Sequence, residues 1–309
     1  MIPGLSGRPF LHLCPSGVAC GEARGPGCGW LYDVGMPLVV ALARSTHPGP
    51  ALAVTAVAVV LAIAAELDGW RIVLLGLAVL LNQASVGLSN DWIDADRDRA
   101  VGRTDKPVAQ GLVSAATARN VAVGAVVVAI ALTLPLGWAA TLVHALFIGS
   151  AWAYNAGLKN SVLSVVPYIV SFGSLPLIVT LASADPRLAA PWALGAGALL
   201  GVSAHFANVL PDLDDDRATG VSGLPHKLGR RVSGVVIAVA LAAASTLVAF
   251  GPGAGNLQLL GFVVSLGIAA ATIFLAVTRP PTRVLFQLIM SAAILNVAMI
   301  TSAGSALYA

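Results

Sequence analysis

The stretch at residues 70–98 reads WRIVLLGLAVLLNQASVGLSNDWIDADRD, a long apolar run that passes directly into four aspartates. The apolar part is long enough to cross a bilayer as a helix. Ionisable side chains in or beside a membrane segment are costly to bury and usually mark a functional site. The stretch therefore predicts a membrane helix that carries carboxylates to a site at its end.

The rest of the chain has the composition of a membrane protein. Its 309 residues are 58% hydrophobic and 10% charged, with a mean hydropathy of +0.88. Apolar runs of membrane-helix length lie at 50–67, 70–90, 115–134, 137–155, 162–182, 191–209, 231–250, 256–277 and 283–303. We expect an all-α polytopic membrane protein with about nine transmembrane helices in a bundle around a central cavity.

The N-terminal segment differs from the rest. Residues 1–43 are rich in Gly and Pro and lack the basic region and apolar run of a signal peptide. We expect this segment to be a disordered tail, or to lie upstream of a true start at Met36. Residues 44–309 are predicted to form a single membrane domain.

The distribution of Lys and Arg predicts the orientation. With nine spans, the N-terminus and the loops after the second, fourth, sixth and eighth spans share one side and hold fifteen of the seventeen basic residues. The other side holds Arg71 and Arg187. Because basic residues favour the cytoplasmic side, we expect a multi-pass cell-membrane protein with its acidic loops facing the cytoplasm.

The acidic pattern occurs twice. Asn90, Asp94 and Asp98 have the spacing N-x3-D-x3-D, and Asn208, Asp212 and Asp216 repeat it 118 residues later. Eight identities in register span the two copies, and an even number of spans separates them. This pattern predicts a parallel repeat whose two units share one cavity.

Helical geometry brings these side chains together. At 100° per residue, Asp91, Asp94 and Asp98 share one face, as do Asn208, Asp212 and Asp216, whereas Asp96 and Asp214 point elsewhere. Carboxylate oxygens suit hard cations, and Mg2+ binds one or two carboxylates together with substrate phosphates. The two faces therefore predict two Mg2+ ions that hold a diphosphate between the repeats.

Basic residues follow the acidic segments. Arg103 and Lys106 come after the first segment, Lys227 comes after the second, and Lys159 is the only basic residue in its loop. Cations at these positions can stabilise the charge that develops on a departing diphosphate. Asp105 is interpreted as a loop residue or a partner of an arginine.

These motifs resemble the two signatures of the UbiA superfamily of intramembrane prenyltransferases. N-D-x2-D-x3-D at 90–98 is similar to the first signature and D-x3-D at 212–216 to the second. R-T-D-K-P-V-A-Q-G at 103–111 is similar to the family's run of a basic residue, Pro and Gly, with Lys106 where Arg is commoner. Y-x4-K at 154–159 is also similar to a family element. The resemblance covers about residues 44–305.

The resemblance implies Mg2+-dependent transfer of an isoprenyl group from its diphosphate to a lipophilic or aromatic acceptor, an alkyl-transferring reaction. It implies metal–diphosphate roles for Asn90, Asp91, Asp94, Asp98, Asp212 and Asp216, and diphosphate contacts for Arg103, Lys106, Tyr154, Lys159 and Lys227. Among these, Asp91, Asp94, Asp212 and Lys159 are the candidate catalytic residues, and Asn208 is a further candidate for substrate binding. Trp92, Trp152, Tyr168, Phe172 and Phe206 are aromatic candidates to stabilise an allylic cation.

Two alternatives remain open. A terpene cyclase on the same scaffold would share the metal and diphosphate contacts, and a cation transporter could use the same carboxylates. Transport predicts acids at the bilayer midplane, whereas these lie at helix ends beside basic loops. The lipid bilayer is an expected partner, and a nucleic acid is not.

Overall fold

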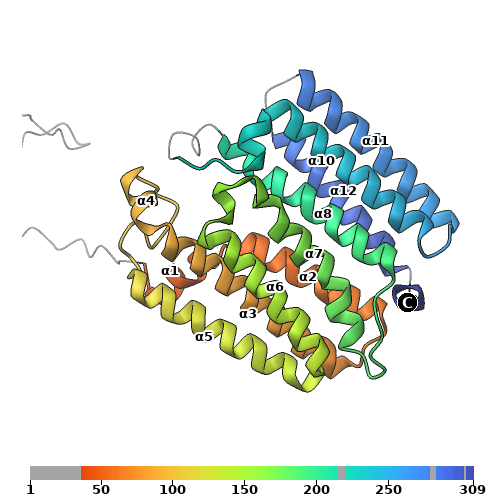
Figure 1. The fold of residues 1–309 in the computed structure, drawn as a ribbon, viewed down its shortest axis with the longest axis horizontal. Helices are drawn as coiled ribbons and strands as arrows, with labels where there is room; N and C mark the ends of the chain where they lie inside the picture. Colours follow the sequence, from red (N-terminus) through yellow and green to blue (C-terminus); the bar gives the residue numbers. More distant parts are fainter. Residues whose placement is uncertain (1–35, 214–219, 279–282, 303) are drawn as a thin grey trace, which may run out of the picture. The chain divides into compact units, whose positions relative to one another are not determined.

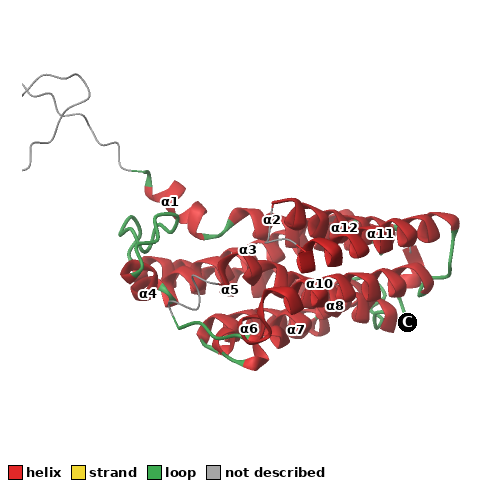
Figure 2. Cartoon of the chain, turned by 90° about the horizontal axis from the view of Figure 1, so that it is seen from above, coloured by secondary structure: helices red, strands yellow, loops and turns green. Residues whose placement is uncertain are grey.

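A computed structural model describes residues 36–213, 220–278, 283–302 and 304–309 of the chain. Within these ranges the regular elements are helices, and no β-strand forms (Figure 2). The all-α prediction is confirmed.

The element order follows the apolar runs of the sequence. The α-helices are α1 (Leu38–Ser45), α2 (Pro48–Ala64), α3 (Gly69–Ile93), α4 (Ala95–Ala100), α5 (Ala115–Thr133), α6 (Trp138–Ala156), α7 (Val166–Leu181), α8 (Pro191–Val209), α10 (Leu224–Phe250), α11 (Asn256–Thr278) and α12 (Arg283–Thr301). Short 3-10 turns are η1 (Leu134–Leu136), η2 (Leu158–Asn160), η3 (Val162–Val165), η4 (Leu210–Asp212) and η5 (Gly304–Leu307).

Each of the nine predicted spans falls on one of the longer described helices, from α2 to α12. By length and hydropathy alone, six described helices could cross a membrane, or seven if α1 and α2, which meet at a 62° bend, form one span. The count of nine is therefore approximate. One boundary differs: α10 begins seven residues before the predicted run at 231, because it continues through a kink at Gly229.

Helices that are neighbours in the sequence pack against each other, and the last helix packs against one of the first (Figure 1). α3 packs against α2, α5 and α6, α7 packs against α6 and α8, and α10 packs against α8, α11 and α12. α12 in turn contacts α2. The largest buried cluster includes Leu75, Phe147, Ile178 and Met299, whereas large apolar side chains also cover outward faces. Such all-round hydrophobicity is typical of helices that face lipid.

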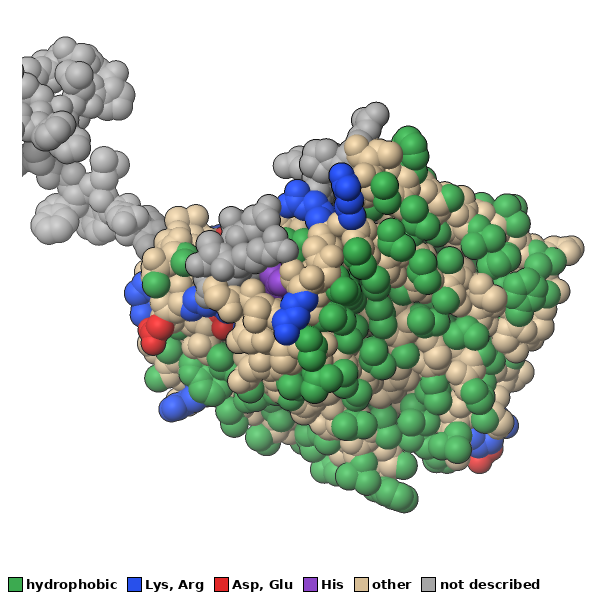
Figure 3. Space-filling model, turned by 45° about the horizontal axis from the view of Figure 1, so that its top comes forward, with side chains coloured by type: hydrophobic (Ala, Val, Ile, Leu, Met, Phe, Trp, Pro, Cys, Tyr) green, Lys and Arg blue, Asp and Glu red, His purple; other side chains and the backbone are tan. Residues whose placement is uncertain are grey.

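Charged side chains collect where the helices end. α3 and α8 run toward the pole at which the acidic motifs lie, and α5 and α10 begin there with Arg119, Arg230 and Arg231. In Figure 3 most of the visible Lys and Arg side chains lie toward one end of the molecule, a smaller charged group lies at the other end, and hydrophobic side chains are frequent between them. The same asymmetry underlies the predicted orientation.

At the pole opposite the acidic motifs, the last residues of the chain hold neighbouring helix ends together. Tyr308 donates its hydroxyl to the carbonyl of Ala65 at 2.8 Å, and the Arg187 guanidinium lies 4.4 Å from the centre of the Tyr308 ring. Ala190 N–H donates to the carbonyl of Leu307 at 2.8 Å. These contacts join the end of α2, the loop before α8 and the C-terminal segment.

Residues 36–43, which the sequence places in the tail, are described and belong to the same compact unit as the rest of the domain. α1 begins within this region and ends at Ser45, and its Ala41 is fully buried. Residues 1–35 lie outside the described residues. The sharp bend between α1 and α2 falls at His47, which has a left-handed backbone with φ of 52°.

Candidate active site

Three carboxylates are buried at the end of α3. Only Asp94 separates α3 from α4, and the i→i−4 hydrogen bonds continue through it, from Asp94 N–H to Asn90 and from Asp98 N–H to Asp94. Asp91, Asp94 and Asp98 consequently share one face and are 1%, 5% and 3% exposed. The Asp96 side chain is fully exposed and pairs with Arg99, so the prediction that it points elsewhere is confirmed.

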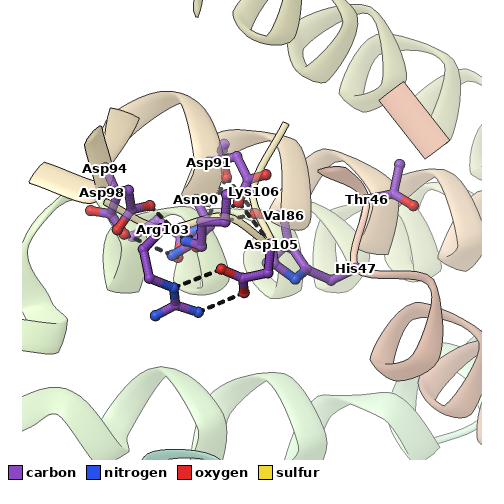
Figure 4. Close-up of polar contacts among 12 residues, drawn as sticks. Thr46, His47, Val86, Asn90, Asp91, Asp94, Asp98, Arg103, Asp105 and Lys106 are labelled. Carbon is purple, nitrogen blue, oxygen red and sulfur yellow. Dashed lines mark hydrogen bonds and ion pairs between the residues drawn. The ribbon is translucent and has the colours of Figure 1, made fainter. Parts of the chain in front are cut away.

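Lys106 reaches into this cluster from the loop after α4 (Figure 4). Its Nζ lies 2.8 Å from Oδ2 of Asp98, 3.4 Å from Oδ1 of Asp91 and 3.0 Å from Oδ1 of Asn90. Oxygen atoms of three side chains thus surround one ammonium group. A buried charge needs such a set of partners to offset its lost hydration.

Lys159 approaches the same cluster from the turn after α6. Its Nζ lies 2.6 Å from both carboxylate oxygens of Asp94. Burial lowers the pKa of the Lys159 amine below its ordinary value, while the adjacent Asp94 carboxylate acts in the opposite direction. Lys106 and Lys159 therefore each neutralise a different part of the acidic face.

Asn155 ties α6 to α3 beside the carboxylates. Its side-chain amide donates to the carbonyl of Val86 at 2.9 Å and to the Ser89 hydroxyl at 2.8 Å, and its oxygen accepts from Asn90 at 3.4 Å. Asn155 lies on the last turn of α6, which ends at Ala156, whereas Lys159 belongs to the separate turn η2. The sequence motifs do not indicate Asn155, because its role depends on contacts with α3 that no local spacing records.

His47 is a second residue that the motifs did not indicate. Its Nε2 lies 2.9 Å from Oδ1 of Asp91. The bend before α2 reaches α3 because Gly87 has no side chain there; a Cβ on Gly87 would overlap the backbone of Thr46. His47 and Asp91 are 44 residues apart in the sequence, so no local spacing could indicate their contact.

Arg97 and Arg103 lie at the edge of the cluster. Arg97 contacts Asp94 at 2.9 Å, at i, i+3 spacing. Arg103 donates two hydrogen bonds to Asp105, at 2.8 and 2.7 Å, which confirms the interpretation of Asp105 as an arginine partner. The Arg103 hydrogen bond lowers the pKa of Asp105 from 3.8 to about 2.

The second motif is described only in part. Asn208 is exposed at the end of α8, and Lys227 is exposed on the first turns of α10. Asp212 closes η4, but its side chain and all of Asp216 lie outside the described residues.

The segment 158–164 contacts both halves of the chain. The Lys159 side chain binds Asp94, whereas the Ser164 hydroxyl accepts from Leu224 N–H at 2.9 Å and lies 3.0 Å from Nε2 of His205. Tyr154 packs its ring against His205 at a centroid distance of 5.8 Å. The ends of α3 and α8 therefore flank one segment.

Comparison with known proteins decides the family. A family model described as the UbiA prenyltransferase family matches residues 51–295, most of the chain. The chain belongs to the UbiA prenyltransferase family. The resemblance inferred from the motifs is confirmed, and so is the expectation of a prenyl-transferring membrane enzyme.

One curated relative is the digeranylgeranylglyceryl phosphate synthase of Natronomonas pharaonis. It is 30% identical over 159 residues, which cover 50% of this chain and 56% of the relative. The similarity thus spans little more than half of that synthase.

Solved UbiA homologues share the fold. The homologue from Archaeoglobus fulgidus, bound to DMAPP and Mg2+, gives a TM-score of 0.66 at 13% identity and covers 86% of this chain and 99% of its own. The apo homologue from Aeropyrum pernix K1 gives a TM-score of 0.63 at 20% identity, and the match covers 86% of this chain and 98% of the homologue. These likenesses confirm the fold of this UbiA-family protein.

The residues of this family member fit a divalent cation. No three His, Cys, Asp or Glu side chains among the described residues are grouped as a ready metal site. However, Oδ2 of Asp91 is buried without a hydrogen-bond partner among the described residues, and oxygens from three side chains already surround the cationic Nζ of Lys106. Oxygen ligands of this kind are those that Mg2+ prefers.

Proposed function

We propose that this protein transfers an isoprenyl group from an isoprenyl diphosphate to a lipophilic or aromatic acceptor, using Mg2+ and releasing diphosphate. One observation carries the proposal: oxygens of Asn90, Asp91 and Asp98 converge on a single buried cation, the Lys106 ammonium group. A simple ion pair needs only one carboxylate. A cluster of this kind at the end of a membrane helix instead suits a polyvalent ligand such as metal–diphosphate.

The chain's own residues would divide the work as follows. Asp91, Asp94 and Asp98 of the first motif, with Asp212 and Asp216 of the second, would hold the metal, which we propose to be two ions. When bound, Mg2+ neutralises diphosphate charge and favours its departure. Further diphosphate contacts are proposed for Asn90, Arg103, Lys106, Tyr154, Lys159, Asn208 and Lys227.

Lys106 and Lys159 have the clearest role in the chemistry. When the allylic carbon–oxygen bond breaks, its electron pair leaves with the diphosphate, and ammonium groups close to the phosphate oxygens stabilise that charge. The allylic cation is then attacked by an electron pair of the acceptor, which loses a proton. Apolar helices around the site keep water from capturing the cation first.

Orientation and acceptor belong to the same proposal. Basic residues gathered at the acidic pole favour its placement on the cytoplasmic side of the cell membrane. Similarity to a digeranylgeranylglyceryl phosphate synthase adds a phosphorylated glyceryl lipid to the phenolic and quinone-type acceptors that should be tested.

The test is product analysis with purified protein, Mg2+ and geranyl diphosphate, with and without acceptors. We expect diphosphate release coupled to a prenylated acceptor. Asp91→Asn should lower the rate at least about 100-fold, whereas the matched Asp96→Asn variant, altered at an exposed acid, should stay near wild type. A cyclic hydrocarbon formed without acceptor would instead identify a terpene cyclase, and equal rates for the two variants would contradict the assigned site.

A further inference from the structure

The buried cluster neutralises its own charge. Asp91 and Asp98 face Lys106, and Asp94 faces Lys159 and Arg97. Three carboxylates thus face three side chains of fixed positive charge, and His47 adds a further contact to Asp91 at 2.9 Å. A bare Mg2+ would add two positive charges to a cluster that is already balanced, which is unfavourable where water is excluded.

The two lysines also contact four of the six carboxylate oxygen atoms of Asp91, Asp94 and Asp98. Lys106 contacts Oδ1 of Asp91 and Oδ2 of Asp98, and Lys159 contacts both oxygens of Asp94. An ammonium ion and a metal ion cannot both take these positions. A metal ion that binds through these four oxygen atoms, beside the unpartnered Oδ2 of Asp91, must therefore displace the lysines from their present partners.

We propose that Lys106 and Lys159 act as internal counter-ions that keep divalent metal off the carboxylates until a diphosphate enters. The inference rests on the proposed function, since it is the diphosphate that supplies new partners for the lysines. When metal and diphosphate enter together, the carboxylates exchange ammonium for metal, and the ammonium groups move to phosphate oxygens. Metal and diphosphate then bind cooperatively, and either alone binds weakly.

The positions of the lysines suit such an exchange. Lys106 is in the loop between α4 and α5, and Lys159 is in the short turn η2, so neither belongs to a long packed helix. The lysine stem is flexible and its ammonium group is compact, which allows it to change partners without backbone movement. Asn90, which accepts from Lys106 and donates to Asp94, links the two lysine sites, so loss of one pairing should affect the other.

The proposal makes an unusual prediction about removing a positive charge. Lys106→Gln and Lys159→Gln should each bind Mn2+ alone at least about tenfold more tightly than wild type, because a competing cation is gone. The same variants should bind inorganic pyrophosphate in the presence of Mn2+ more weakly than wild type. A residue that only stabilised the fold or only bound phosphate would not tighten metal binding.

The experiment measures Mn2+ bound to the purified full-length chain at fixed free Mn2+, with and without inorganic pyrophosphate. Arg99→Gln is the matched control: it removes one positive charge from the neighbouring helix α4, where Arg99 pairs with exposed Asp96 outside the cluster. We expect Arg99→Gln to bind Mn2+ as wild type does. For any variant that is poorly folded, thermal unfolding gives a second measurement, since added Mn2+ should stabilise that variant more than wild type.

Two results would each overturn the proposal. One is unchanged or weaker binding of Mn2+ alone in both lysine variants, and the other is wild-type Mn2+ binding that pyrophosphate does not strengthen. Failure of the proposed function looks different: Mn2+ and pyrophosphate would bind cooperatively, yet geranyl diphosphate would yield neither diphosphate nor a prenylated product.

Discussion

The carbonyl oxygen of Lys159 lies 2.6 Å from the point that a Cβ atom on Gly223 would occupy. Lys159 thus makes two kinds of contact: its side chain binds Asp94, and its backbone packs against the segment that leads into α10. A single residue connects the first acidic motif to the part of the chain that follows the second. The exact position of Lys159 therefore depends on the absence of a side chain at Gly223.

Gly223→Ala is expected to impair catalysis more than stability. The added methyl group would overlap the Lys159 carbonyl, so the η2 turn or the segment before α10 must shift, which changes the position of Lys159 relative to the site. We expect the rate of diphosphate release to fall about tenfold or more, because small misplacements of catalytic groups are costly. Gly149→Ala is the control, since a Cβ there meets no atom within 4 Å. Similar rates for both variants would show that the turn does not depend on this contact.

His47→Ala should raise the Mg2+ concentration needed for half-maximal activity. The change removes the 2.9 Å contact to Asp91 and so frees a candidate ligand to adopt other positions. Loss of a group that orients a metal ligand typically costs about 10- to 100-fold in affinity or activity. His47→Gln, which can still donate to the carboxylate, should recover part of the loss. Thr46→Ala, which loses only a local hydrogen bond to Ala43, should match wild type in the same Mg2+ titration.

Asn155→Ala should destabilise the contact between α6 and α3. The variant leaves the carbonyl of Val86 without its side-chain donor and removes the hydrogen bond to Ser89. We expect a loss of about 1 to 3 kcal/mol in the free energy of unfolding, measured by denaturant in detergent. The double variant with Asn90→Ala should lose less unfolding free energy than the sum of the two single variants, because Asn90 and Asn155 share a hydrogen bond. Strict additivity would argue against a shared network.

The ion pair between Arg103 and Asp105 should stabilise the fold at neutral pH and make its stability depend on pH only below about pH 4. The folded-state pKa of Asp105, about 2, is lower than the ordinary value of 3.8, so the pair stabilises the fold above about pH 4. That contribution is lost as the pH falls through 2. Both side chains are substantially exposed, so we expect Asp105→Asn to cost no more than about 1 kcal/mol at neutral pH.

The measurement compares the unfolding free energies of wild type and Asp105→Asn from pH 7 downward. The difference should stay constant to about pH 4 and then disappear. A difference that changed between pH 5 and 7 would assign the effect to another group.

Local spacing explains which parts of the site could be predicted from the sequence. Asp91, Asp94 and Asp98 lie on a nearly continuous helix, so a period of 3.6 residues placed them on one face and Asp96 outside it. The apolar runs likewise indicated the position of every long described helix, because membrane helices must satisfy their own backbone hydrogen bonds.

Tertiary contacts explain the remainder. His47 meets Asp91 only because the bend before α2 rests on Gly87, and no periodicity records that approach. The pairing of Lys106 with Asp98 depends on how the loop after α4 folds back, which charge spacing alone does not determine. The segment assigned to the tail includes most of α1, whose eight residues are too short to give a clear membrane-span signal.

The fastening of Tyr308 to Ala65 has a consequence for how a long substrate enters. The helix ends at that pole are held together by the C-terminal segment, so they should move little relative to one another. Any sideways parting of the helices to admit a lipid chain should hinge there and open widest beside the carboxylates. A lipid substrate of the proposed kind would then enter from one side, with its reactive head at the pole of the carboxylates.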